Sequence, residues 1–452
     1  MSKTKPTFRP HTQVPPLWQE LVWLGQQGVL GLCVEGILTG LVAGSVIAIF
    51  RLAYTKIGQI LVDLAGSYSQ ESFTFLVGLV GYLLFSLIIS FLLLRFEPLI
   101  SGSGIPQVEL QVAGLIGPMR WLKVLLAKFL GTLVSLSAGL SVGREGPCIQ
   151  MGAAAALGLG SFFRAKSGPS LARFLIAGAV AGMTAAFGAP IAGLLFAFEE
   201  MRTVLVPSLF LFCAFSAAAA WFVVQVVFDF GLVFPLEKIV ALDFEQWWLV
   251  LFFGLATGLL SAFYNQLLVG TTLFADGLRV PKLLRVSVPF ILAAILFYFY
   301  PYVLTNFGLP ILALEEQYLP FLALLLFLLA KMLFSAISFA STVAGGLLMP
   351  MLAIGAIFGA TVSRLVLDWE LLCVEQSGVC LILGMVGLFA GTVRAPLTGT
   401  FLVLEMTHAI SSLPAMIVTA GLAVFFCNLL RSEPVYESLK RRILRLQDKV
   451  AS

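Results

Sequence analysis

Two adjacent charged residues, Arg144 and Glu145, lie between glycines in a chain that is 60% hydrophobic and only 11% charged. An ionised side chain at membrane depth is costly, so such a group usually faces a partner, a cavity or an ion. Pro147 follows, and proline suits the first turn of a helix, where no N–H is required. The pattern Gly143-Arg144-Glu145-Gly146-Pro147 therefore predicts Glu145 at a helix N-terminus, where free backbone N–H groups attract anions. This would be an anion site in which a carboxylate already lies.

Three other segments could supply ligands to an anion. Ser103, in the segment GSGIP (102–106), could bind an anion through its hydroxyl or could simply cap the following helix, and both readings stay open. The segment GGLLMP (345–350) predicts a second broken helix start, whose backbone N–H groups need no particular side chain. Tyr436 could donate its phenolic O–H, although an interfacial aromatic anchor is the commoner role for a tyrosine in this position.

Two acidic residues, Glu199 and Glu200, end the uncharged run Phe174–Phe198 and precede Arg202. They could form a carboxylate–arginine pair at a membrane boundary. Neighbouring residues on a helix point about 100° apart, so one of them could instead face the protein interior. A carboxyl group in apolar surroundings can take up and release protons near neutral pH. Together with Glu145, the sequence thus offers two titratable carboxyl groups along one proton route.

Several kinds of chemistry are disfavoured. The two histidines, His11 and His408, form no H-E-x-x-H motif, and Ser103 has no evident histidine base, which argues against a metal site and an intramembrane hydrolase. No Walker-type sequence indicates nucleotide-driven pumping. We therefore expect a protein that is not an enzyme, binds no metal or cofactor, has no nucleic-acid partner, and runs any transport on ion gradients. Cys373 and Cys380 share an expected external loop, so a disulfide between them is left open.

The hydropathy of the chain predicts an all-α, polytopic membrane protein. Mean hydropathy is +1.03. A helix needs about 20 apolar residues to cross a hydrocarbon core roughly 30 Å thick. Uncharged runs of this length cover Ser72–Leu94, Phe174–Phe198, Thr203–Phe228, Val286–Leu314, Met332–Ser363 and Ala409–Leu430.

The placement of basic residues predicts that both termini lie in the cytoplasm. Cytoplasmic segments next to membrane spans are enriched in lysine and arginine. The basic residues near the two ends are Lys3, Lys5 and Arg9, and Arg441, Arg442, Arg445 and Lys449.

The chain also repeats itself. The segment AKFL (127–130) recurs as AKML (330–333), and GAPIAG (188–193) matches RAPLTG (394–399). Gly143, Pro147 and Gly152 recur as Gly346, Pro350 and Gly355, and Glu199 as Glu405. We therefore divide the chain into residues 26–235 and 236–430, flanked by cytoplasmic segments 1–25 and 431–452.

The charges of matching loops predict that the two halves have opposite orientations. The region after the Pro147 helix is basic, through Arg164, Lys166 and Arg173, whereas the region after the Pro350 helix is acidic, through Asp368, Glu370 and Glu375. Matching loops then lie on opposite faces of the membrane, as an inverted repeat requires. In such proteins broken helices meet near the midplane and direct their ends at the substrate.

Taken together, these motifs resemble the CLC family of chloride channels and chloride/proton antiporters. The resemblance rests on GSGIP (102–106), GREGP (143–147), EEMR (199–202), GGLLMP (345–350) and Tyr436, which occur in that order over nearly the whole chain. It implies a fold of about eighteen helices in two inverted-topology halves, a homodimer in the lipid bilayer, and one anion pathway in each subunit.

The resemblance also implies roles for individual residues. A chloride ion, bound as substrate, would be held by the hydroxyls of Ser103 and Tyr436 and by the backbone N–H groups of Leu347 and Leu348. Glu145 would be the gating and external proton glutamate. Glu200 would be the internal proton glutamate, which channel members generally lack, so exchange of chloride for protons is expected, with a passive chloride channel as the alternative.

Two residues depart from the family pattern. Leu348 stands where a phenylalanine is usual, and Gln107 stands where a second acid often follows GSGIP. Ser103 matches the chloride-type members, whereas nitrate-preferring relatives tend to carry proline there. The chain resembles the bacterial members, which lack cytoplasmic nucleotide-sensing domains, and we expect it in the bacterial inner membrane.

Overall fold

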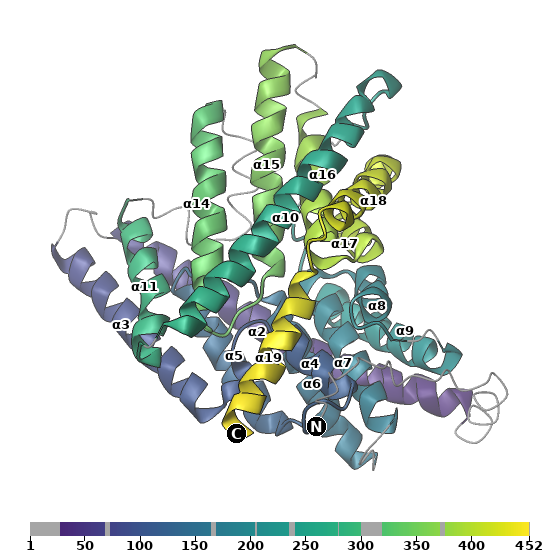
Figure 1. Cartoon of the computed structure of the whole chain (residues 1–452). Helices are drawn as coiled ribbons and strands as arrows, with labels where there is room; N and C mark the ends of the chain where they lie inside the picture. The colour runs from purple at the N-terminus through teal and green to yellow at the C-terminus, as the bar shows by residue number, and fades with distance from the viewer. Residues whose placement is uncertain are drawn as a thin grey trace, which may run out of the picture.

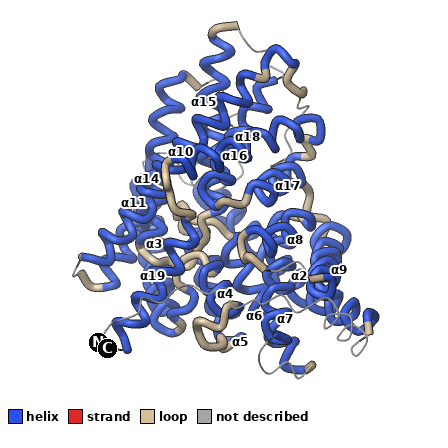
Figure 2. Tube along the Cα trace, turned by 45° about the vertical axis from the view of Figure 1, so that its right-hand side comes forward, coloured by secondary structure: helices blue, strands red, loops and turns tan. Residues whose placement is uncertain are grey.

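The computed structural model is helical through the part of the chain that it describes, apart from loops and two isolated β-bridges (Figure 1 and Figure 2). The described residues are 28–67, 73–163, 169–203, 206–234, 240–278, 280–299, 319–370 and 376–451. The segment 1–25 expected in the cytoplasm lies outside them, as do Arg164, Lys166, Cys373 and Glu375.

The helices follow one another with few long connections. The first half contains α2 (Val29–Ser67), α3 (Phe73–Phe96), α4 (Ile105–Val112), α5 (Trp121–Ser137), α6 (Glu145–Phe162), α7 (Pro169–Phe187), α8 (Pro190–Glu199) and α9 (Pro207–Trp221). The second half contains α10 (Trp248–Gly277), α11 (Lys282–Phe299), α14 (Phe321–Ala340), α15 (Leu348–Asp368), α16 (Ser377–Val393), α17 (Pro396–Thr407) and α18 (Leu413–Leu429), followed by the amphipathic α19 (Val435–Ala451). Short helical turns are η1 (Pro98–Ile100), the π-helical η2 (Phe222–Val227), η3 (Phe244–Gln246) and η5 (Ile410–Ser412).

Seven helical stretches within the described residues are long and apolar enough to cross a membrane. They carry exposed apolar side chains, such as Phe85 and Leu92 on α3, which a bilayer can solvate. By contrast, α16 is apolar all round and nearly all of its side chains are buried, as expected for a helix enclosed by protein. The prediction of an all-helical polytopic membrane protein is confirmed.

Two of the long uncharged runs each contain a break between helices. The run Phe174–Phe198 holds the end of α7 and the start of α8, and the run Met332–Ser363 holds the end of α14 and the start of α15. Each break precedes a proline, Pro190 or Pro350, which lies in the first turn of the next helix. Proline is tolerated there because the first N–H groups of a helix have no intrahelical partner.

Corresponding helices of the two halves pack in the same way. α6 lies against α7 as α15 lies against α16, and α2 packs on α9 as α10 packs on α18. In Figure 1, α6 to α9 lie in the lower part of the view and α15 to α18 in the upper part. A Cβ added to Gly152 would lie 2.2 Å from Gly178 O, and one added to Gly355 would lie 2.5 Å from Gly384 O. The same close helix crossing, which only glycine permits, is thus built twice.

Reciprocal hydrogen bonds join the halves along a pseudo-two-fold axis. Gly143 N donates to Gly346 O at 2.7 Å, and Gly346 N donates to Gly143 O at 2.6 Å. Glu199 accepts from backbone N–H groups at the start of α17, while Glu405 accepts from those at the start of α8. Each of these residues is bonded to the partner's counterpart position, which confirms the predicted inverted repeat.

Two predictions from the sequence are wrong. Arg173 lies not in a loop but buried in α7, where its Nη2 donates to Glu35 Oε2 at 3.0 Å and its guanidinium lies over the ring of Phe212. This ion pair compensates both charges and gives Glu35 a role that its sequence context did not indicate. Cys380 lies buried in α16 as a free thiol rather than in an external loop.

Candidate functional site

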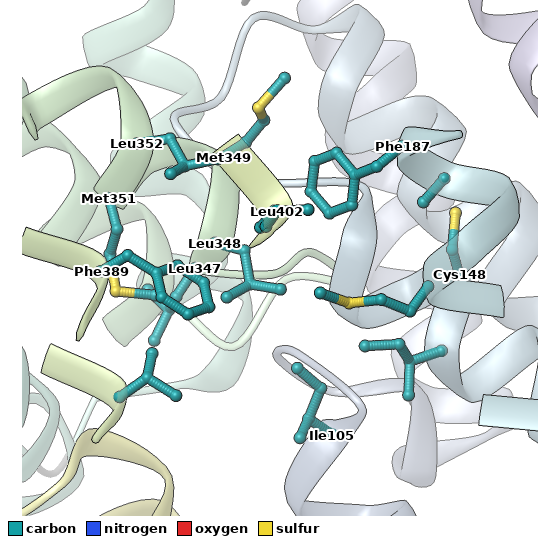
Figure 3. Close-up of a cluster of buried hydrophobic side chains, with 14 of the residues drawn as sticks. Ile105, Cys148, Phe187, Leu347, Leu348, Met349, Met351, Leu352, Phe389 and Leu402 are labelled. Carbon is teal, nitrogen blue, oxygen red and sulfur yellow. The ribbon is translucent and has the colours of Figure 1, made fainter. Parts of the chain in front are cut away.

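The starts of α4, α6 and α15 are held together by backbone hydrogen bonds between the loops that precede them. Gly102 N donates to Val343 O at 3.1 Å, and Gly345 N donates to Gly102 O at 3.1 Å. The Gly143–Gly346 bridge adds the loop before α6. Figure 3 shows the result, with Ile105 of α4, Leu348 of α15 and Cys148 of α6 lying around one region. Three helix N-termini therefore converge inside the protein, which favours a negative charge there.

Ser103 and Tyr436 bring two buried hydroxyl groups to this region. Ser103 is 2% exposed and Tyr436 is 0% exposed. The two side chains interact, yet neither oxygen has a hydrogen bond of ordinary length and angle among the described residues. Buried polar groups are normally satisfied, so a pair of unsatisfied hydroxyls suits a ligand that accepts hydrogen bonds. An anion has this property.

Both alternative roles for these residues are excluded by the geometry. The N-cap of α4 is Gly104, and no side chain caps that helix, so Ser103 is not a helix cap. Tyr436 is enclosed by protein, so it does not anchor the chain at a membrane surface. Gly146 allows the close approach of α6, because a Cβ there would lie 2.2 Å from Ser103 Oγ.

The loop that carries Ser103 is fixed by two side chains. Lys128 is fully buried in α5, and its Nζ donates to Ile100 O at 2.8 Å and to Gly102 O at 2.6 Å. Gln107 Nε2 donates to Ser101 O at 2.7 Å. The departure at Gln107 thus has a structural role in holding the same loop. The role of Lys128 was missed, although a lone lysine in an apolar helix was a signal for it.

Glu145 is the first residue of α6 and is fully buried. Its Oε2 accepts a hydrogen bond of 3.3 Å from Met349 N in the first turn of α15. Its Oε1 lies 3.9 Å from Arg144 Nε and accepts no hydrogen bond among the described residues. A Cβ on Gly143 would lie 2.3 Å from Glu145 Oε2, so that glycine leaves room for the carboxylate. The carboxylate therefore lies where an anion at the α15 N-terminus would lie.

Leu347 and Leu348 form the N-cap and the first residue of α15. Both side chains are fully buried, and Figure 3 places Leu348 among apolar side chains from several helices. The first N–H groups of a helix lack intrahelical acceptors. These two N–H groups can therefore donate to an anion beside Ser103 whatever side chain the residue carries, which is why a leucine can replace the usual phenylalanine.

The adjacent acids Glu199 and Glu200 lie in different surroundings. Glu199 Oε2 accepts from Thr398 N at 2.6 Å and from Thr398 Oγ1 at 2.8 Å, so this carboxylate caps α17. Glu200 is the C-cap of α8 and is buried. The expected pair between these acids and Arg202 is not formed, because Arg202 Nη1 lies 3.0 Å from Glu437 Oε1 instead.

A cluster of charges surrounds Glu200 at the start of α19. Lys440 Nζ lies 2.6 Å from Glu109 Oε2 on α4 and 2.9 Å from Glu437 Oε1. Glu109, Lys440, Arg202 and Glu437 all act electrostatically on Glu200. We refer to Glu109, Glu200, Arg202, Glu437 and Lys440 as the inner charge cluster. Sequence analysis noted only Glu200 and Arg202 as a pair, since the cluster unites segments that are far apart in the chain.

Comparison with known proteins places the chain among ion transporters. Residues 85–428 match the family model described as voltage gated chloride channel. The "H(+)/Cl(-) exchange transporter ClcA" of Vibrio cholerae is 35% identical over 365 residues, which are 79% of this chain and 77% of the relative. The protein of the same description from Cronobacter sakazakii is 32% identical over 383 residues, covering 83% of this chain and 80% of the relative.

Solved structures agree with this assignment. A "slow cyanobacterial Cl-/H+ antiporter" matches with a TM-score of 0.85 and 28% identity, and covers 92% of this chain and 99% of its own. A "CLC-type fluoride/proton antiporter" has a TM-score of 0.74 and covers 90% of this chain and 97% of its own; at 19% identity it supports the fold alone.

Proposed function

Because the chain belongs to the family of voltage-gated chloride channels, we propose that it is a secondary active transporter that exchanges chloride for protons. The observation that carries this proposal is the position of Tyr436. Its buried hydroxyl interacts with Ser103 and lies within electrostatic range of both Glu145 and Glu200. A ligand site for an anion thus adjoins two buried carboxyl groups that can carry protons.

The anion would be held by dipoles rather than by a full positive charge. The hydroxyls of Ser103 and Tyr436 and the N–H groups of Leu347 and Leu348 donate hydrogen bonds. Lys128 contributes positive charge through the loop, but its Nζ is occupied by two carbonyl groups. Transport requires binding that is strong enough for entry and weak enough for release. Donors of this kind suit a chloride ion that must leave again.

Glu145 would act as the gate. Its ionised carboxylate accepts from Met349 N and so competes with an incoming anion for the α15 N-terminus. Protonation removes the charge that makes this position favourable, and the side chain can then give way to chloride. The gate therefore exchanges one negative charge for another, and its proton comes from the exterior.

Glu200 would load protons from the inner side. It is buried beside the inner charge cluster and apart from Glu145, and it does not share the cap that holds Glu199. An anion bound by Ser103 and Tyr436 need not pass Glu200, so the proton and anion routes separate on the inner side.

A flux measurement on purified protein in liposomes tests this function. With chloride and pH electrodes read together, a chloride gradient should drive protons uphill. Chloride movement without proton movement would instead identify a passive chloride channel, and no movement of either ion would refute transport.

The anion site has its own test in Ser103→Pro. We expect the ratio of chloride to nitrate flux to fall by up to about tenfold, because a hydrogen bond to a charged group contributes about 1.5 kcal/mol. Ser101→Ala removes a hydroxyl two positions earlier and should leave the ratio unchanged. A ratio unaltered by Ser103→Pro would remove Ser103 from the anion ligands.

We further propose a homodimer in the bacterial inner membrane with both termini in the cytoplasm. The bacterial relatives support the location, and the basic residues Arg441, Arg442 and Arg445 of α19 support the orientation. The family resemblance supports the dimer. The mass of the protein in mild detergent should correspond to two chains, and a mass of one chain at all concentrations would contradict it.

A further inference from the structure

The C-terminal helix α19 carries two buried polar side chains on one face. Tyr436 and Lys440 are four residues apart, which places them one above the other on the helix. Both are buried, and α19 lies against α4. The first residue belongs to the proposed anion site, and the second belongs to the inner charge cluster. One helix face therefore connects the two ion sites.

The opposite element repeats this arrangement. Ser103 directly precedes α4, and Glu109 lies on α4 itself. Ser103 interacts with Tyr436, and Glu109 is paired with Lys440 at 2.6 Å. Two contacts thus join α4 to α19, one between hydroxyl groups and one between charges. Any shift of α19 relative to α4 would alter both.

Lys440 is the buried cation between two buried acids. Glu109 and Glu200 are close enough to repel each other when both are ionised, and Lys440 attracts both. A buried carboxylate without a partner is costly and tends to take up a proton. The ion pair with Lys440 favours the ionised form of Glu109, and this leaves Glu200 as the acid that holds the exchangeable proton.

We propose that Lys440 is a positioning residue that keeps Glu109 ionised, assigns the exchangeable inner proton to Glu200, and ties this acid to the anion ligand Tyr436. The proposal rests on the proton-exchange function proposed above. It concerns a residue outside the motifs that carry the family resemblance.

The other charges near Glu200 are accounted for by existing partners. On α19 and beyond the end of α8, Glu437 pairs with Arg202 and with Lys440. Among the helices packed against α8, α7 carries Arg173, which is paired with Glu35, and α17 carries Glu405, which caps the start of α8. Lys440 is therefore the cation whose removal changes the balance between the two buried acids most directly.

The experiment compares the pH dependence of proton flux in liposomes for the wild type and for Lys440→Met. Without the cation, the two carboxyl groups bind a shared proton more tightly, because an opposite charge nearby stabilises the ionised form by one to three pH units. We expect the internal pH of half-maximal proton flux to rise by about one unit. The number of protons moved per chloride should also fall, because release becomes slow.

Three further variants separate this role from a structural one. Lys440→Arg keeps the charge and should restore the wild-type profile. Glu109→Gln combined with Lys440→Met replaces the ion pair by a neutral pair and should move the profile back toward the wild type. Arg442→Met removes a different ion pair of α19, that with Asp276 at 2.6 Å, and should leave the profile unchanged.

The possible failures are distinguishable. If the wild type moves no protons, the proposed function fails. If the wild type couples the two ions but Lys440→Met keeps its pH profile and its proton-to-chloride ratio, the role of Lys440 is refuted. If Arg442→Met produces the same shift, anchoring of α19 explains the effect and the proposal is likewise refuted. If Lys440→Met does not fold, an unshifted profile for Lys440→Arg together with a shifted profile for Lys440→Gln carries the test.

Discussion

Proton movement is expected to fall to the level of protein-free liposomes when Glu145 is replaced by glutamine, while chloride movement continues. An amide cannot take up or release a proton near neutral pH, and it carries no charge with which to compete for the α15 N-terminus. The donors of the anion site, Ser103 and Tyr436, remain in place. The measurement is simultaneous recording of chloride and pH after a chloride gradient is imposed.

Glu405→Gln is the matched control for this variant. Glu405 is also an acid at a helix N-terminus, where its two oxygens accept from Ile191 N at 3.1 Å and from Ala192 N at 2.8 Å. It has no contact with Ser103 or Tyr436 among the described residues. Its substitution should leave coupling intact. Uphill proton movement by Glu145→Gln would show that the gate lies elsewhere.

Glu200→Gln is expected to stop proton movement and to leave chloride flux measurable. The side chain keeps its shape and part of its hydrogen bonding but loses titration. Glu200 lies in the inner charge cluster, away from the donors that hold the anion, so the anion route should survive. The same two-electrode recording reads both ions at once.

The neighbouring acid provides the internal control. Glu199 accepts hydrogen bonds at the start of α17, from Leu397 N at 3.0 Å and from Thr398 N at 2.6 Å. Glu199→Gln should therefore lower stability by about 1 kcal/mol, as loss of a helix cap does, without uncoupling the ions. The opposite outcome, with Glu199→Gln uncoupled and Glu200→Gln coupled, would exchange the roles of the two acids. If neither variant matters and protons never couple, the passive channel is the correct function.

The broken helices could be predicted because their signals are local. Glycine and proline at fixed offsets mark where α4, α6 and α15 begin, and the recurrence of Gly143 as Gly346 marks the repeat. These features depend on backbone conformation and hydrogen bonding within a few residues. The halves and their opposite orientations could be inferred from the same residues together with the charges of the loops.

The partners of buried charges could not be predicted. Arg173 was expected in a basic loop, and only the three-dimensional packing of α2 against α7 shows that it pairs with Glu35. Likewise, the sequence of α19 indicates a basic amphipathic helix but not that Lys440 faces Glu109. Such pairs join segments far apart in the chain, and no local pattern records which face of a helix meets which neighbour.

The reciprocal contacts between the halves have a consequence for synthesis of the protein. The first half reaches the membrane with Glu199 and the Gly143 loop lacking the groups that satisfy them, because those groups belong to α17 and to the loop before α15. Unsatisfied backbone groups are costly in lipid. The first half must therefore wait in a shielded setting until the second half emerges, so the order of insertion, and not only the final energy, is constrained by the symmetry.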